Sequence, residues 1–309
     1  MKTCLITYEP ISGGAVYSRA GLNLLSRNLK TLASLPFNTA KLREEALARS
    51  DKMSVQGVQP KLSAVLKISE GRFEIVDRNG TFILKPQCDF PEVPQNEAVT
   101  MTMAGEIGID VPVHGLVQCK DNDFVYFVKR FDRVGRNEKV AIEDFAQLSG
   151  ESRETKYDSS MEKVAHVIET YCTFPKIEFI KLFERTLFCF LVGNEDMHLK
   201  NFSLIRQAGK VELSPAYDMV NSTIAIINPK EEMALPINGK RAKFDKNDLV
   251  DSFAIKQLGL NVKIIDEIFV RVSAALPKWK KLVSASFLSD TMKKKYLIVL
   301  NGRQARLGL

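Results

Sequence analysis

Cysteine and histidine are scarce in this 309-residue chain, and neither forms a metal-binding pattern. The five cysteines and three histidines are scattered along the sequence: Cys4, Cys88, Cys119, Cys172, Cys189, His114, His166 and His198. No CxxC pair occurs, so the spacing excludes the usual zinc sites, and an odd number of separated cysteines argues against a disulfide framework. We therefore expect reduced thiols, as in a cytoplasmic protein.

Long apolar runs are also missing. No stretch approaches the roughly 18 consecutive apolar residues that a membrane helix needs, and residues 1–14 lack the apolar segment and cleavage site of a secretory signal. Hydrophobic residues still make up 45% of the chain and charged residues 26%, which is enough apolar material for a large core and excludes a wholly disordered chain. The sequence predicts a cytoplasmic globular protein with no membrane partner.

Acidic residues are nearly absent from the C-terminal end of the chain. Residues 278–309 contain eight basic side chains and a single acid, Asp290. This segment therefore carries the whole formal net charge of +7, and residues 1–277 are neutral. Such a cluster is typical either of a surface that binds nucleic-acid phosphates or of the solvated side of a helix. The apolar stretches LVSASFL and YLIVL between the lysines favour the solvated helix.

The first half of the chain predicts a small lobe rich in antiparallel strands. Residues 18–51 have the pattern of two helices, the second capped by Asn38. Strands are expected within residues 53–67. The segments RFEIVDRN and GTFILKP alternate apolar and polar residues around Asn79-Gly80, which predicts a hairpin between them.

A helix over residues 95–108 and two strands within residues 115–133, which turn at Asp121-Asn122-Asp123, complete this lobe. After residue 137 the pattern becomes mostly helical, over residues 159–192 and 246–300. Pro277 is expected to break the last stretch, and NFSLIRQAGKVELS predicts a hairpin that turns at Ala208-Gly209. The sequence thus predicts an α+β fold of two lobes, residues 1–136 and 137–309, joined by a hinge at residues 129–132, with a ligand cleft between them.

The stretch GNEDMHLKNFSLI, residues 193–205, carries the strongest chemical signal. Asp196 and Asn201 have the spacing DxxxxN, and Asp218 follows in SPAYDMV. Kinases use such a set, in which the first Asp takes the proton of the substrate hydroxyl while the Asn and the second Asp hold Mg²⁺ on the nucleotide. The same pattern arises in a turn where Asp196 and Asn201 only bond the local backbone, so the surrounding sequence has to decide.

Three further kinase parts precede this loop in the expected order. Lys85 ends a predicted strand, where it would meet the ATP phosphates, and Glu97 lies on the next helix, where it would hold that lysine. The loop SVQGVQPK upstream would cover the phosphates. The eukaryotic motifs GxGxxG, HRD and DFG are absent, and residues 194–196 and 217–219 read NED and YDM instead. The combination predicts an ATP-dependent phosphotransferase outside the eukaryotic pattern.

Seven segments in fixed order give the chain a specific resemblance. SVQGVQPKLS, FILKP, NEAVTMTMAGEIGI, VKRFDR, IEDFAQLSG, DMHLKNFS and SPAYDMV resemble the HipA family of bacterial toxin serine/threonine kinases, from about residue 50 to about residue 225. The resemblance implies a bilobal protein-kinase-like fold with a strand-rich N-lobe and a helical C-lobe. The start lacks the further N-terminal subdomain of HipA, which makes the chain most similar to HipT, the kinase of three-component HipBST systems.

The resemblance implies a role for each matching residue. Asp196 would be catalytic, Asn201 and Asp218 would bind Mg²⁺, and Glu97 would position Lys85. The hinge would meet adenine, with Asp132 near the ribose. The residues implied to bind ATP are Gln56, Gly57, Val58, Gln59, Pro60, Lys61, Lys85, Lys129, Arg130, Phe131, Asp132, His198, Lys200 and Tyr217.

The resemblance also implies regulation and partners. Ser54 matches a position that such kinases autophosphorylate, and a phosphate there would repel ATP and switch the enzyme off. Position 56 is a glutamine, so the S-x-S pair of some HipT relatives is not present. The implied partners are an aminoacyl-tRNA synthetase as substrate, a HipS-like small protein, and a HipB-like antitoxin that alone contacts DNA.

Two alternatives stay open from the residues. Small-molecule kinases of the aminoglycoside or choline type also use DxxxxN followed by an Asp. A non-catalytic module that docks a DNA-binding antitoxin would instead explain the basic end of the chain.

Overall fold

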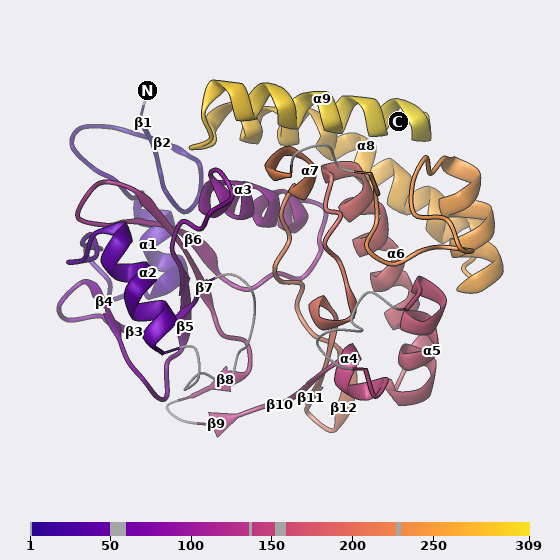
Figure 1. Ribbon diagram of the computed structural model, residues 1–309, viewed down its shortest axis with the longest axis horizontal. Helices are drawn as coiled ribbons and strands as arrows, with labels where there is room; N and C mark the ends of the chain where they lie inside the picture. The colour runs from indigo at the N-terminus through magenta and orange to yellow at the C-terminus, as the bar shows by residue number, and fades with distance from the viewer. Residues whose placement is uncertain (1, 50–59, 136–137, 152–158, 227–229) are drawn as a thin grey trace.

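The computed structural model describes residues 2–49, 60–135, 138–151, 159–226 and 230–309. A five-stranded antiparallel sheet forms the centre of the N-terminal half (Figure 1). Its spatial order is β4-β3-β5-β7-β6. The strands are β3 (Leu62–Lys67), β4 (Arg72–Ile75), β5 (Phe82–Lys85), β6 (His114–Gln118) and β7 (Phe124–Lys129).

The turn at residues 121–123 joins β6 and β7 as predicted, but the predicted hairpin around Asn79-Gly80 is wrong. Strands β4 and β5 lie on opposite sides of β3, and each pairs with β3 rather than with the other. The chain turns first at residues 68–71 and then crosses β3. A Cβ on Gly80 would lie 2.9 Å from the backbone nitrogen of Ala64. The alternating pattern located both strands correctly but did not indicate which strand each one pairs with.

The N-terminal segments cover one face of this sheet. A short pair, β1 (Lys2–Thr3) and β2 (Pro10–Ile11), precedes helices α1 (Arg19–Leu25) and α2 (Thr39–Ala48). The Asn38 side chain accepts a hydrogen bond from the Lys41 amide, which confirms the predicted cap. Leu22 and Leu42 pack here in one apolar cluster with sheet residues such as Phe127.

Helix α3 (Val93–Glu106) lies on the other face of the sheet, where it packs against β6 and β7. Its buried side chains belong to the main core, together with those of the C-terminal half. The helix therefore lies between the sheet and the helical part of the molecule (Figure 1). This position lets α3 contact both halves of the predicted cleft.

The middle of the chain contains the predicted C-lobe helices and hairpin. A second sheet has the order β10-β11-β12, and β11 and β12 form the hairpin expected at Ala208-Gly209. The elements of this region are β8 (Arg133–Val134), β9 (Glu138–Lys139), β10 (Ala141–Asp144), α4 (Phe145–Leu148), α5 (Met161–Tyr171), α6 (Pro175–Val192), the 3₁₀ turn η2 (Leu199–Asn201), β11 (Ser203–Gln207) and β12 (Lys210–Leu213).

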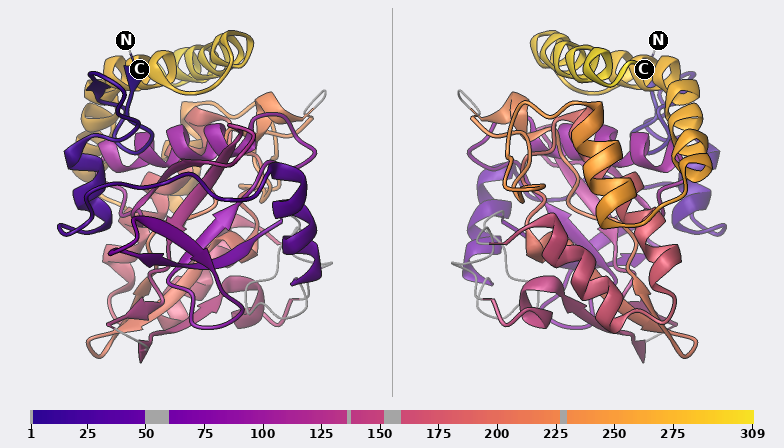
Figure 2. Two further views of the ribbon diagram at one scale, coloured as in Figure 1. Left: turned by 90° about the vertical axis from the view of Figure 1, so that its left-hand side faces the viewer. Right: turned by 90° about the vertical axis from the view of Figure 1, so that its right-hand side faces the viewer.

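Helices also end the chain: α7 (Ser222–Ala225), the π-helix η3 (Asp248–Gln257), α8 (Val262–Ala285) and α9 (Asp290–Leu307). Pro277 lies inside α8 and does not break it, contrary to prediction. A proline removes one backbone hydrogen bond, and burial of the neighbouring Leu276 and Trp279 holds the helix together across this gap. Helix α9 runs along one edge of the molecule, against α6, α7 and α8 (Figures 1 and 2).

The arrangement confirms the predicted α+β fold, with a strand-rich N-terminal half and a mostly helical C-terminal half. The predicted boundary at residues 136–137 lies outside the described ranges, between β8 and β9, and it stays a prediction. Among the described helices, none is long and apolar enough to cross a membrane.

Candidate active site

Lys85, at the end of β5, is the buried centre of an ion cluster. Its Nζ lies 2.5 Å from Oε1 of Glu97 on α3 and also donates to Oδ1 of Asp218, which lies between β12 and α7. The Lys85 side chain is 2% exposed. Nζ also lies 5.4 Å from the ring centroid of Tyr126, its cross-strand partner on β7, a cation–π distance. Three residues predicted from separate motifs therefore meet around one ammonium group.

The two carboxylates of this cluster differ in their acidity. Burial raises the pKa of Asp218, but the Lys85 and Lys61 ammonium groups outweigh it and hold that pKa far below its ordinary range. Burial likewise raises the pKa of Glu97 to about 7, against the attraction of Lys85, and the negative charge of Asp218 adds to the rise. Two carboxylates that share one cation titrate as a pair, and here Asp218 ionises first.

Lys61 brings the end of the predicted phosphate loop to the same place. Its Nζ lies 3.8 Å from Oδ2 of Asp218, so the carboxylate has a lysine on each oxygen. Asp218 itself has a φ of 55°, in the left-handed region that side chains other than glycine seldom adopt. Pro60 is the other described residue of that loop. Five predicted residues lie outside the described ranges: Ser54, Gln56, Gly57, Val58 and Gln59.

The predicted catalytic loop follows α6, which ends at Gly193 in the left-handed conformation typical of a C-cap. The Asp196 side chain is 50% exposed, and its Oδ1 lies 3.9 Å from Nε2 of the buried His198. The Asn201 amide donates to the Asp196 carbonyl at 2.7 Å. Lys200, on the turn η2, accepts a hydrogen bond from the Tyr217 hydroxyl through its carbonyl. The loop thus presents the Asp196 carboxylate toward solvent from a rigid support.

The donor set fits a magnesium ion. Because Asn201 uses its NH₂ group on the Asp196 carbonyl, its side-chain oxygen is directed elsewhere as an acceptor. Asp218 supplies a carboxylate that stays ionised. One carboxylate and one amide oxygen suit Mg²⁺, which completes its shell with water and phosphate oxygens. No cluster of three or more His, Cys, Asp or Glu that would hold a metal by protein ligands alone occurs among the described residues.

The predicted hinge begins at Lys129, the last residue of β7, and contacts the metal-site segment. The rings of Phe131 and Tyr217 lie 5.7 Å apart between centroids. Arg130 binds Asp132 through two hydrogen bonds of 2.9 and 2.7 Å. Burial opposes ionisation of Asp132, but Arg130 and Arg133 hold its pKa below the ordinary value. Lys129, Arg130 and Phe131 also line a hollow of about 340 Å³ together with residues 112–113 and 133–135.

One ion pair that ties the catalytic loop to the end of the chain was not predicted. Glu195 accepts hydrogen bonds from Arg303 of α9, at 3.1 Å, and from the hydroxyl of Thr223 on α7. Arg303 also donates to the carbonyl of Phe190 on α6 at 2.7 Å and lies over its ring. More than a hundred residues separate Glu195 from Arg303, and no local pattern in the sequence indicates the pairing.

This pair also reduces the basic surface predicted for residues 278–309. Arg303 is buried, and Arg306, one helical turn later, binds Glu232 through both of its terminal nitrogens. Lys281, Lys294 and Lys295 remain on the exposed side of their helices. Part of the excess positive charge therefore lies on buried or ion-paired arginines, and the remaining lysines lie on solvated helix surfaces.

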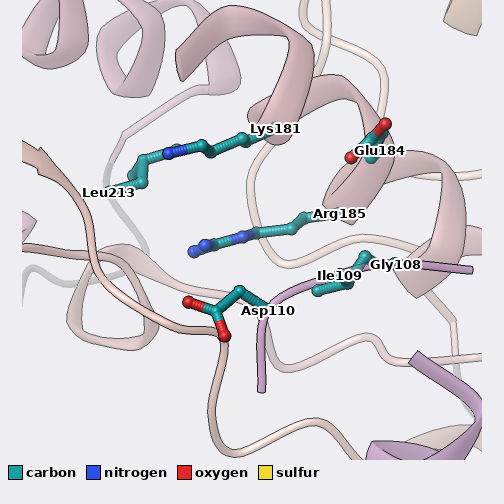
Figure 3. A pocket seen from close by; sticks show the side chains of 7 residues that line it. All are labelled: Gly108, Ile109, Asp110, Lys181, Glu184, Arg185 and Leu213. Carbon is teal, nitrogen blue, oxygen red and sulfur yellow. The ribbon is translucent and has the colours of Figure 1, made fainter. Parts of the chain in front are cut away.

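A second, smaller cavity of about 80 Å³ lies beside the segment that precedes Asp218 (Figure 3). Lys181 and Arg185 extend from α6 across it, with Asp110 on the opposite wall. The buried Arg185 donates to the Ser214 carbonyl, and the Asp110 carbonyl accepts from the Ala216 amide at 2.7 Å. These contacts hold the segment that leads to Asp218, and no predicted site residue lines the cavity.

Comparison with known proteins places the chain in a family. Residues 53–279 match the model of the HipA-like C-terminal domain. A relative from Haemophilus influenzae, named "Putative kinase", is 28% identical over 93% of this chain and 92% of its own length. A kinase-named protein from Sinorhizobium fredii is 35% identical over 80% of this chain. The chain spans 65% of that protein.

A toxin of known name and two solved structures are also similar. The serine/threonine-protein kinase toxin HipA of Shewanella oneidensis is 25% identical over 74% of this chain, which covers 56% of the toxin. The structure of a Shewanella HipA–HipB–operator DNA complex contains a chain similar to this one, with a TM-score of 0.71 and 21% identity. The match covers 96% of this chain and 80% of that chain. The structure of the Helicobacter pylori kinase CtkA matches 73% of this chain over 87% of the CtkA chain, with a TM-score of 0.53 and 17% identity. Both structures support the kinase-like fold. With the family model covering most of the sequence and kinase-named relatives along nearly its whole length, this chain belongs to the HipA-like family of kinases.

Proposed function

We propose that this protein is a Mg²⁺- and ATP-dependent protein serine/threonine kinase that acts as the toxin of a toxin–antitoxin system. The observation that carries the proposal is the position of Lys85, which contacts Glu97 and Asp218 together although the three come from separate motifs. Kinases need this arrangement, because the lysine must meet the phosphates while the carboxylate beside it holds the metal. Membership of the HipA-like family agrees with the same chemistry.

In the proposed reaction, Asp196 accepts the proton of a substrate serine hydroxyl. The serine oxygen forms a bond to the γ-phosphorus, the bond from that phosphorus to the bridging oxygen of ATP breaks, and ADP leaves with the electron pair. Lys85 and Lys61 would hold the phosphates. Asn201 and Asp218 would hold Mg²⁺, which neutralises charge on the phosphate oxygens when bound.

The hinge residues Lys129, Arg130, Phe131 and Asp132 would hold adenine and ribose, and Tyr217 contacts Phe131 from the metal-site segment. His198, beside Asp196, and Lys200 on η2 would lie near the nucleotide. The loop from Gln56 to Lys61 would close over the phosphates. Ser54 lies just before this loop in the sequence. Its phosphorylation would add negative charge beside the ATP phosphates and weaken ATP binding.

The proposed protein substrate is consistent with the open position of Asp196, whose side chain is half exposed. Family resemblance suggests an aminoacyl-tRNA synthetase. A HipB-like DNA-binding antitoxin and a HipS-like small protein are the proposed partners, as in HipT systems. The Shewanella HipA structure with HipB and operator DNA supports the proposal of a HipB-like antitoxin partner for this chain.

The proposal is tested by incubating the purified protein with γ-labelled Mg-ATP and a bacterial lysate. Label in a protein band, absent with Asp196→Asn, is the expected result. Label confined to metabolites would indicate a small-molecule kinase. Mass spectrometry of the purified protein after the same incubation tests Ser54, and an active enzyme with unmodified Ser54 would remove the proposed autoregulation. Undiminished toxicity of Asp218→Ala in cells would favour a non-catalytic module.

A further inference from the structure

Asn96 on α3 makes an unusual contact with the backbone of the segment that follows Asp218. Its side-chain NH₂ group donates to the carbonyl of Asn221 at 2.9 Å, and its side-chain oxygen accepts from the Asn221 amide at 2.9 Å. Asn96 and Asn221 are both fully buried. The pair of bonds copies the exchange between two strands, and it requires a side chain with one donor and one acceptor in a plane.

The contact joins the two chain segments that carry the Lys85 carboxylates. Asn96 directly precedes Glu97, and Asn221 comes three residues after Asp218. Glu97 and Asp218 bind the same Lys85 nitrogen. The Asn96–Asn221 contact therefore ties together the two segments that carry these carboxylates.

A buried hydroxyl chain from the C-terminal helix supports Asn96. Thr100, one turn along α3, donates to the Asn96 side-chain oxygen at 3.3 Å, and the hydroxyl of Tyr296 on α9 lies 2.9 Å from that of Thr100. Because Thr100 has a single hydroxyl proton and gives it to Asn96, Tyr296 must be the donor to Thr100. Thr100 and Tyr296 are completely buried, so water cannot replace these bonds.

We propose that Asn96 is a positioning residue that holds Lys85 between its two carboxylates, and that Tyr296 of α9 acts through Thr100 to hold Asn96. This inference rests on the proposed kinase function for its effect on catalysis. Helix α3 is thereby fixed to the Asp218 segment by neutral hydrogen bonds in addition to the charged ones. A shift of the lysine by about 1 Å would cost on the order of 10²-fold in rate.

The test uses three variants of the full chain. Asn96→Asp keeps the shape of the side chain but places an oxygen against the Asn221 carbonyl, and Tyr296→Phe removes only the hydroxyl. Thr102→Val is the matched control, since Thr102 lies on α3 and its hydroxyl bonds Ala98 and His114 rather than Asn96. We expect Asn96→Asp to lower kcat/KM for ATP by about 10- to 100-fold, Tyr296→Phe to lower it less, and Thr102→Val to leave it within about twofold.

The double variant Asn96→Asp/Tyr296→Phe should be no worse than Asn96→Asp alone, because the two residues act in series. Amide hydrogen exchange should rise together over residues 93–106 and 216–222 in Asn96→Asp. A folded Asn96→Asp protein with unchanged kinetic constants would overturn the positioning role, as would additive losses in the double variant. If the wild-type protein phosphorylates nothing, the proposed kinase function fails, and hydrogen exchange alone still decides whether Asn96 couples the two segments.

Discussion

The two aspartates of the candidate site lie in contrasting surroundings. Asp218 has a lysine near each carboxylate oxygen and a strained backbone. The Asp196 side chain is half exposed and has His198 3.9 Å away. The first region, the anchor, is an electrostatic cluster around the buried Lys85, with the Asp218 side chain 30% exposed. In the second, open region the Asp196 side chain is 50% exposed. The difference matches the proposed division between holding the nucleotide and accepting the proton.

The regions also differ in what holds them. Asp218 is fixed from the N-terminal sheet and α3, through Lys85 and Asn96. The catalytic loop is fixed from the C-terminal side, through Thr223 of α7 and Arg303 of α9. Both sets of contacts reach α9, through Tyr296 for the first region and Arg303 for the second, but they use different side chains. The comparison is therefore testable by substitution.

The largest expected effect comes from the open region. Asp196→Asn should lower kcat by about 1,000-fold, the typical contribution of a positioned general base. The melting temperature and the ATP affinity of this variant should stay close to those of the wild type, because asparagine keeps the shape of the side chain and the proposed role of the carboxylate is toward the substrate hydroxyl rather than the phosphates. Stopped-flow or filter assays with calorimetric ATP binding provide the measurement. A parallel loss of ATP affinity would show that the two regions are not separate.

The next largest effect comes from the anchor. Lys85→Met leaves Glu97 buried beside Asp218 without their common cation, and removal of one partner from a buried pair typically costs about 3–5 kcal/mol. We expect both the free energy of unfolding and ATP affinity to fall. The double variant Lys85→Met/Glu97→Gln should recover much of the stability but none of the ATP affinity. Equal stability of the single and double variants in urea titrations would argue against the ion cluster.

A smaller effect is expected at the support of the catalytic loop. Arg303→Gln leaves the Glu195 carboxylate, 8% exposed, without its charged partner, at a cost of about 2 kcal/mol. It should lower kcat more than it raises KM for ATP, because it disturbs the loop and not the anchor. Arg306→Gln on the same helix is the matched control and should leave kcat intact. A change in KM with constant kcat would place Arg303 with the anchor instead.

The last expected effect is on stability alone and leaves catalysis aside: a pH dependence that separates the two anchor carboxylates. The pKa of Glu97 rises from 4.5 to about 7 on folding, so the folded protein binds this proton more tightly and loses stability as pH rises between these values. The pKa of Asp218 is lowered, so its contribution is present at neutral pH and is lost on acidification below its ordinary pKa.

Urea unfolding of the wild type and of Glu97→Gln at pH 5 and pH 8 tests the first sign. Wild-type stability relative to the variant should be lower at pH 8 than at pH 5. A constant difference would show that Glu97 is already ionised at pH 5.

The sequence predicted the parts of the site that depend on order and spacing. Lys85, Glu97 and Asp218 were assigned from a strand end, a helix and a loop, and the structure brings all three together. It did not predict the contacts that depend on distant packing. Asn96 and Arg303 have no local signature, because their partners lie more than a hundred residues away.

The same limit explains the errors in the fold. Alternation located β4 and β5 but could not show that β3 lies between them. Pro277 is a helix breaker by local chemistry, and only the packing of its neighbours Leu276 and Trp279 explains why α8 continues.

The central claim is that the anchor and the catalytic loop together transfer phosphate from ATP to protein. The most direct test measures protein-bound label from γ-labelled ATP for the wild type, Asp196→Asn and Lys85→Met at saturating Mg²⁺, with ATP binding measured on the same samples. The account predicts labelled protein only with the wild type, with ATP still bound by Asp196→Asn and lost from Lys85→Met. Equal labelling by all three proteins, or none by a wild type that binds ATP, would contradict it.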